Sequence, residues 1–121
     1  MSNNRRAGRI YLKVDGVRYD AKGNFSYSLG TPKRSAIVGA DKVHGFSEEP
    51  QVPYIEGEIT DSRDLDLRKL TEVVDATVTL ELGNGKVISL RDAWYAAEGK
   101  GESKEGNIAV RFEGMDAEEV R

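Results

Sequence analysis

The chain has 121 residues, which is the size of one domain. It has no cysteine, so catalysis or metal ligation by thiolates is excluded, and its formal net charge of -3 gives no bulk attraction for nucleic acid. No apolar run approaches the roughly 20 residues of a membrane span. The amino-terminal sequence MSNNRRAGR also lacks the apolar core of a signal peptide. We therefore expect a soluble intracellular protein without a membrane anchor.

The first part of the chain predicts a run of antiparallel strands. Apolar side chains occupy every second position of Arg9–Asp15, which is the pattern of a half-buried strand. Asp15-Gly16 favours a tight turn, so Val17–Tyr19 can return antiparallel to the first strand. Lys22-Gly23-Asn24 predicts another turn. The strand that follows, Asn24–Leu29, has aromatic and aliphatic residues on one face and small uncharged residues on the other.

The most unusual segment is a hairpin with an oversized connection. Lys33–Val38 and Tyr54–Thr60 predict its two strands, and Gly39–Pro53 joins them. Hairpin connections usually take about two to five residues. This one also contains three apolar residues that a solvated loop does not need: Val43, Phe46 and Val52. Two interpretations stay open: the connection docks onto another molecule, or it folds back and caps its own core.

After residue 60 the pattern changes to a helix and then returns to strands. Leu67, Leu70 and Val74 repeat at three- and four-residue spacing, which predicts one short helix over about Asp66–Val73, capped by an aspartate. The charged, glycine-rich loop Glu98–Gly106 is expected to be solvated. Three further strands are predicted at Ala76–Leu82, Lys86–Ala97 and Asn107–Glu113.

These elements define one expected domain over residues 1–121. Its fold class is mainly β: an antiparallel β-sandwich or barrel of about seven to eight strands, with one short flanking α-helix and a long β-hairpin arm. Residues 1–8 are expected to form a flexible arm, residues 39–53 the long hairpin loop, and residues 115–121 a flexible tail with little to pack against.

The sequence offers no convincing catalytic or metal-binding constellation. His44 is the only histidine and lies in the long loop without a cysteine as co-ligand. Glu56 and Glu58 share a strand face, which a solvated strand explains as well as acid–base catalysis does. The aspartates of Asp61–Asp66 resemble part of a calcium loop, but no glycine stands at its central position, and helix capping explains them better. We expect no enzyme, no cofactor and no metal.

An apolar arm on a small β-domain predicts self-association, because a closed ring repeats each weak contact at every subunit. The residues expected at the interface between subunits or rings are Val38, Asp41, Val43, His44, Phe46, Val52 and Tyr54. The competing interpretation is a monomeric small β-domain that uses the long loop to bind a ligand or protein.

An ordered series of short motifs runs through nearly the whole chain. Its members are Val14–Gly16, Gly23–Tyr27, Lys33–Gly39, Gly45-Phe46, Val52–Gly57, the Leu67–Leu70 helix, Leu82–Lys86 and Phe112–Gly114. No single motif is specific, but the series resembles the tail tube protein of contractile-tailed, Mu-like bacteriophages. The match is strongest from Lys33 to Thr60.

The resemblance implies a structural subunit of the virion tail that is assembled in the host cytoplasm. Six copies would close a ring, and rings would stack into a hollow tube inside a contractile sheath, through which DNA is ejected. The implied partners are further copies of the chain, the tail sheath, baseplate, tail terminator and tape measure proteins, and DNA as non-specific passing cargo. The tube proteins of type VI secretion systems and phage-tail-like bacteriocins share this architecture and remain alternatives.

A channel for DNA should not hold the polyanion on its wall. We expect the channel lining to come from polar and acidic strand faces: Asn24, Ser26, Ser28, Glu56 and Glu58. Arg34 is the exception to check, since it could face inward or pair with a glutamate across the hairpin.

Overall fold

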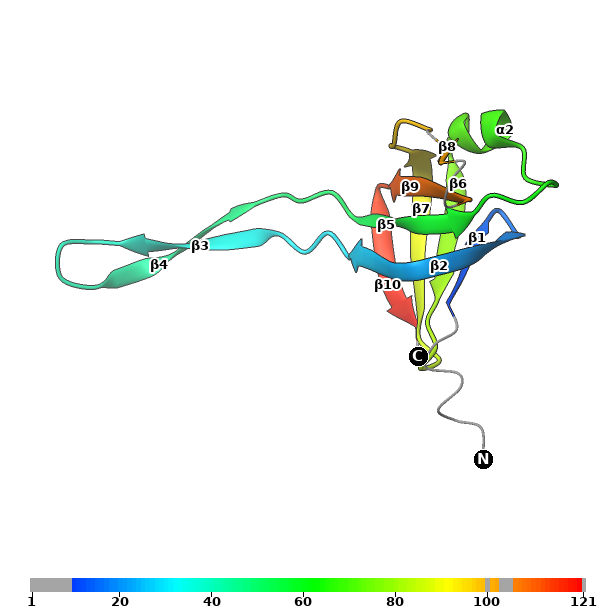
Figure 1. Ribbon diagram of the computed structural model, residues 1–121. Coiled ribbons are helices and arrows are strands. Elements are labelled where there is room, and N and C mark those ends of the chain that lie inside the picture. The colour runs from blue at the N-terminus through cyan, green and yellow to red at the C-terminus, as the bar shows by residue number, and fades with distance from the viewer. Residues whose placement is uncertain (1–9, 100, 103–105, 121) are drawn as a thin grey trace.

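The computed structural model describes residues 10–99, 101–102 and 106–120 (Figure 1). The flexible arm expected at residues 1–8 lies outside this range. The described residues form ten strands and one helix: β1 Tyr11–Val14, β2 Val17–Ser28, β3 Lys33–Val38, β4 Val43–Glu49, β5 Tyr54–Thr60, α2 Leu67–Thr71, β6 Ala76–Glu81, β7 Val87–Tyr95, β8 Gly101–Glu102, β9 Asn107–Glu113 and β10 Asp116–Val120.

Six of these strands close a barrel. Their order is β7-β6-β1-β2-β5-β9, every pairing is antiparallel, and β9 pairs back to β7 through Trp94↔Glu113 and Tyr95↔Phe112. β10 extends the sheet beside β7, and β8 pairs with β9. The predicted fold class, a mainly antiparallel β-barrel with one short helix and a hairpin arm, is confirmed. Strands β4, β8 and β10 raise the strand number above the predicted seven to eight.

The alternating pattern of the strands produces the core. In β1, β5, β6 and β9 one face points inward and is buried, while the other face is more accessible. β2 contributes the partly buried Tyr19 and Phe25 to the same core. The largest fully buried side chains are Phe112, Leu12, Ile55, Ile59, Leu70, Leu80, Ile88, Leu90, Ile108 and Val78. The ring of Phe25 lies over Gly57, where an added Cβ would come within 2.6 Å of it, so β5 needs a glycine at that point.

The turn predicted at Lys22-Gly23-Asn24 is wrong, because β2 runs without interruption from Val17 to Ser28. The polar, glycine-containing segment is instead an irregularity within the strand: the pairing of β2 with β5 shifts between Lys22 and Ser26. A bulge takes up extra residues and bends the strand. Glycine and asparagine mark bulges as well as turns, and the sequence pattern alone does not separate the two.

The predicted helix is present but shorter than expected, covering Leu67–Thr71. The side chain of Asp66 caps it by accepting a hydrogen bond from the backbone N–H of Lys69 at 3.2 Å. Leu70 faces the barrel and is buried, so packing rather than length stabilises this helix.

The long connection expected at residues 39–53 contains a strand. β3 pairs with β4 and not with β5, and the turn between them is short, closed by a 2.8 Å hydrogen bond from Gly39 N–H to the carbonyl of Lys42. Gly45, with φ near +126°, interrupts the alternation of β4, which explains why the strand was missed. The resulting hairpin projects far from the barrel as a separate two-stranded sheet (Figure 1), which we call the arm, residues 31–52.

The prediction of a flexible tail at residues 115–121 is also wrong, because its described residues include a strand. Residues 116–120 form β10, which pairs along β7, and Ala117 packs against the core. Basic side chains on or beside β7 pair with the acidic residues of the tail. Arg91 contacts Glu118 and lies 3.4 Å from Asp116. Lys86 Nζ lies 2.9 Å from the carboxylate of Glu119. The acidic composition of the tail predicted a solvated segment, whereas ion pairs between the strands hold these residues beside β7. Likewise, the loop expected to be solvated at 98–106 includes β8.

We expect truncation after Gly114 to lower the free energy of unfolding by about 2 kcal/mol. Each ladder hydrogen bond contributes about 1 kcal/mol net and each exposed ion pair less, while ordering the strand costs entropy that offsets part of this. Urea denaturation of the two chains measures the difference. Glu118→Gln is the control that removes one ion pair and keeps the ladder, and it should cost under about 0.5 kcal/mol. An unchanged midpoint after truncation would show that β10 does not support the barrel.

Candidate functional site

The first candidate surface is one face of the arm. Residues directly opposite each other in an antiparallel pair share a face, and the register places Ala36 opposite Phe46 and Val38 opposite Val43. These four residues form what we call the apolar arm face. Val38, Val43 and Phe46 are 69%, 63% and 52% exposed, although apolar side chains gain free energy when they leave water.

Polar contacts stabilise the arm, and one of them covers part of the apolar arm face. Arg34 pairs across the hairpin with Glu48 at 2.9 Å, and its guanidinium lies 4.7 Å from the ring centre of Phe46. The imidazole of His44 packs over Gly39 near the turn and leaves no room for a Cβ there. Of the two placements left open for Arg34, pairing with a glutamate across the hairpin is the one observed.

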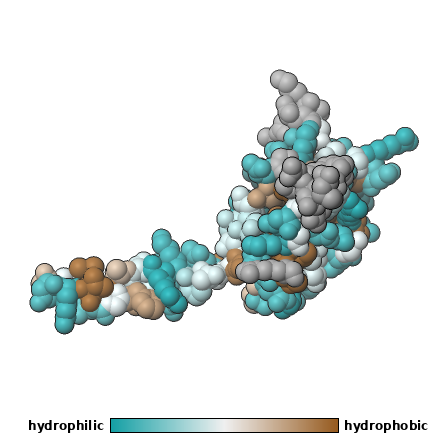
Figure 2. All heavy atoms as spheres, turned by 90° about the horizontal axis from the view of Figure 1, so that it is seen from below, coloured by the Kyte–Doolittle hydropathy of each residue, from teal (hydrophilic) through white to brown (hydrophobic). Residues whose placement is uncertain are grey.

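Six of the seven predicted interface residues lie on or at the base of the arm. Val38, Asp41, Val43, His44, Phe46 and Val52 are all exposed. Figure 2 shows the arm extending away from the barrel, with hydrophobic residues gathered along part of its length. Tyr54 is separate from this group. It begins β5 on the barrel, half-buried, and belongs to the second surface described next.

The second candidate surface is a hollow on the outer face of β2, β5 and β9. Four of the five predicted channel residues line it together, namely Asn24, Ser26, Glu56 and Glu58. Ser28 lies opposite Tyr54 at the end of β2, where its hydroxyl accepts a 3.2 Å hydrogen bond from the N–H of Gly30. We call the outer face of β2, β5 and β9 the hollowed face.

The residue that sequence reasoning missed on this face is Arg111. It stands opposite Glu56 in the pairing of β5 with β9. Its Nη1 lies 3.1 Å from Glu56, its Nε donates to Glu113 at 2.9 Å, and its guanidinium lies 4.1 Å from the ring centre of Tyr54. Partial burial acts to lower the pKa of Arg111, but hydrogen bonds and charge attraction from Glu113 and Glu56 outweigh it and raise that pKa.

Glu58 also has partners on the hollowed face. It lies opposite Lys22 in β2, and its Oε1 accepts a 3.3 Å hydrogen bond from the side chain of Asn107. Both glutamates predicted for the channel therefore stand opposite a cation across a strand pair. The alternation of β9 places Arg111 on the outer face. Its contact with Glu56 depends on the register between β5 and β9, which cannot be read from the sequence alone.

The described residues include no group of three or more histidine or acidic side chains placed to hold a metal ion. His44 is on the arm, away from the hollowed face. Within the same residues no helix is long and apolar enough to cross a membrane.

A barrel with a projecting apolar arm and a polar, acidic outer face has a close match among known families. The family model for phage tail tube proteins matches residues 3–119 of this chain. The chain belongs to the phage tail tube protein family. As a family member it is a structural component of a phage tail and not an enzyme, which confirms the resemblance seen in the sequence.

Individual relatives of this tail tube family member are Mu-like. It is 25% identical over 114 residues to the Mu-like prophage FluMu tail tube protein of Haemophilus influenzae, covering 94% of this chain and 95% of the relative. It is 24% identical over 110 residues to the tail tube protein of Escherichia phage Mu, covering 91% and 92%.

A solved structure shares the fold. The sheath/tube terminator of an extracellular contractile injection system, PVC, seen by cryo-EM in its extended state, matches with a TM-score of 0.66 at 9% sequence identity, over 94% of each chain. At that identity the likeness concerns the fold alone.

Proposed function

We propose that this chain is the repeating subunit of a hollow tail tube. Copies close into hexameric rings, the rings stack through their arms, and the resulting channel conducts DNA inside a contractile sheath. The observation that carries this proposal is the apolar arm face: the arm projects from the barrel (Figure 1), and Val38, Val43 and Phe46 are exposed in the single chain.

The energetics of the arm favour a protein partner. A two-stranded hairpin alone is marginally stable in water, and every residue of β3 and β4 is exposed. Burying Val38, Val43 and Phe46 on a neighbour would contribute about 1.5–3 kcal/mol each. An arm that reaches from one copy to a different surface on the next makes a heterologous contact, the kind that generates rings and filaments.

The hollowed face supplies a suitable channel wall in this proposal. Its side chains are hydroxyls, amides and carboxylates together with cations that stand opposite glutamates. Facing the channel, such a surface would stay hydrated and repel DNA at short range, since screening confines the repulsion to about 8–10 Å. The remaining partners in this role are the sheath, baseplate, terminator and tape measure proteins, met during assembly in the host cytoplasm.

A second candidate is the tube of a phage-tail-like bacteriocin or a type VI secretion system. The observation that favours it is the fold shared with a contractile injection system terminator. This candidate predicts the same arm-dependent assembly and differs only in the cargo. Isolated particles that contain the tube but transport no DNA would favour it.

The test compares one substitution on each face of the arm. Phe46→Ser should shift the chain from tubes to small species in size-exclusion chromatography and negative-stain microscopy, because it removes the largest side chain of the apolar arm face. Ile37→Ser is the matched control: Ile37 is 47% exposed but lies opposite Gly45 on the other face. This control should still form tubes.

Two outcomes would contradict the proposal. A wild-type chain that stays monomeric at high concentration would favour the monomeric binding module. Normal tubes from the Phe46→Ser variant would show that the apolar arm face does not join subunits.

A further inference from the structure

Arg111 presents a problem for a wall that must not hold DNA. It is the one basic residue among the described residues that line the hollow, and a guanidinium is a strong, bidentate ligand for phosphate. Repeated in every subunit of a tube, such a group would offer a phosphate contact at each repeat.

We propose that Glu56 and Glu113 mask Arg111 from DNA phosphate on the channel wall. This inference rests on the proposed function for the position of the hollowed face, and it assigns the two glutamates a positioning role. They hold the guanidinium in place, and they occupy the hydrogen-bonding positions that a phosphate would need.

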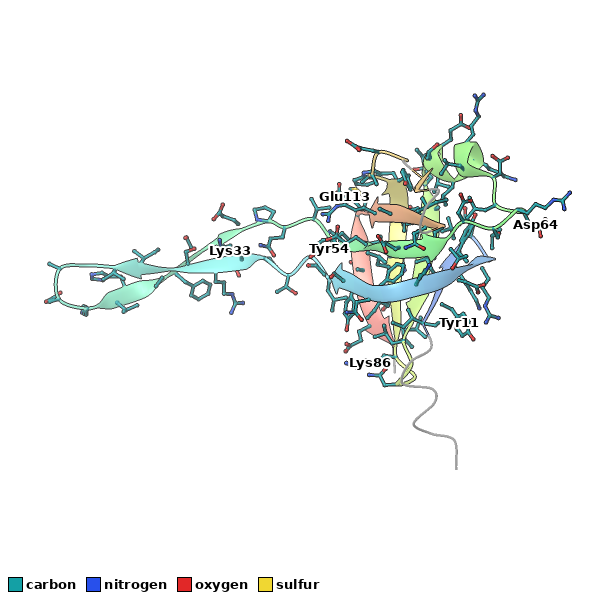
Figure 3. All side chains as sticks on the ribbon, viewed as in Figure 1. Tyr11, Lys33, Tyr54, Asp64, Lys86 and Glu113 are labelled. Atoms are coloured by element: carbon teal, nitrogen blue, oxygen red, sulfur yellow. The ribbon has the colours of Figure 1, made fainter. Side chains whose placement is uncertain are left out.

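The contacts of Arg111 are arranged as a mask on three sides. Glu56 binds the guanidinium from β5 at 3.1 Å, and Glu113 binds it from the same strand at 2.9 Å. The ring of Tyr54 lies against its face at 4.1 Å. Figure 3 shows Tyr54 and Glu113 close together on the barrel at the base of the arm.

The charge balance of the group explains why two acids are needed. One arginine with two glutamates leaves a net charge of -1, so the group as a whole repels phosphate. With one glutamate it would be neutral, and with none it would attract. The side chains of Arg111 and Glu113 are only 30% and 27% exposed, so salt screens their attraction less than it screens a fully solvated pair.

DNA binding by the unassembled subunit tests the mask directly. A short fluorescent DNA duplex at low ionic strength is the probe, read by fluorescence anisotropy. The wild-type chain should bind weakly, and Glu56→Gln with Glu113→Gln should bind about tenfold tighter, the gain of one charge-assisted contact. The logarithm of the affinity should fall more steeply with the logarithm of salt, by about 0.9 for the freed cation.

Two comparison variants identify the cause. Adding Arg111→Gln to the double variant should remove the gain. Glu72→Gln with Asp75→Asn changes the net charge equally without touching Arg111, since both residues lie at the end of the helix and neither lines the hollow. This pair should bind like wild type. If the double variant does not fold, Glu113→Gln alone should give a smaller gain that again disappears with Arg111→Gln.

The results separate the mask from the proposed function. An equal gain in the Glu72/Asp75 control, or a gain that survives Arg111→Gln, would overturn the mask. Assembled tubes of the double variant should also retain added DNA. Tighter binding by the subunit without retention by tubes would overturn the position of the hollowed face on the channel and leave the mask at Arg111 intact.

Discussion

Replacing residues 30–52 by Asn-Gly is expected to abolish tube formation and leave a folded barrel. The pairing of β2 with β5 ends at Ser28 and Tyr54, so Leu29 and residue 53 would flank a two-residue turn. The same variant carries Pro53→Thr, because the residue after such a turn must donate a backbone N–H. Asn-Gly suits such a turn because both positions tolerate the positive φ values of a type I′ hairpin. The arm residues removed from β3 and β4 are exposed, so the free energy of unfolding should change by less than about 1 kcal/mol.

Thermal melting, size-exclusion chromatography and negative-stain microscopy measure the two halves of this expectation separately. The shortened chain should melt cooperatively near the wild-type temperature and elute as a small species. Ser35→Ala with Ser47→Ala in the intact chain is the control, since it alters the polar face of the arm and should preserve tubes. An unfolded shortened chain would mean that the arm stabilises its own barrel. Tubes formed by the shortened chain would show that assembly does not require the arm.

The barrel was predictable because its strands keep a strict period of two. Ile10, Leu12 and Val14 identify β1, and Ile108, Val110 and Phe112 identify β9, by the same alternation that buries them. The elements that were missed break that rule. Gly45 interrupts β4, and the acidic residues of β10 find their partners on β7, which is distant in sequence.

The candidate surfaces show the same division. The exposure of Phe46 and the shared face of Glu56 and Glu58 follow from composition and local alternation, which a single sequence displays. The contact between Arg111 and Glu56 depends on which strand lies beside β5 and in what register. One residue of slippage would move Arg111 to the opposite face, so only the three-dimensional pairing reveals that this acidic face contains a held cation.

Glu56→Lys together with Glu58→Lys is expected to preserve assembly and to slow or stop DNA ejection. The substitutions would place two new cations beside Lys22 and Arg111, which stand opposite them in the register. They would also remove half of the mask on Arg111. Like charges opposite each other cost about 0.2–1 kcal/mol per pair, too little to unfold the barrel. Each new phosphate contact steepens the salt dependence of DNA binding by about 0.9 in the logarithm of the affinity.

The readout is the rate of DNA release from particles built with the variant, at low and at high salt. Release should be slowest at low salt and approach the wild-type rate as salt rises, because phosphate contacts weaken with ionic strength. Glu81→Lys with Glu118→Lys is the matched control: it makes the same charge change and also reverses two ion pairs, with Lys13 and Arg91, on strands outside the hollowed face. Any defect it causes should lack that salt dependence. Normal release of DNA at low salt from the Glu56/Glu58 variant would mean that these glutamates do not face the channel.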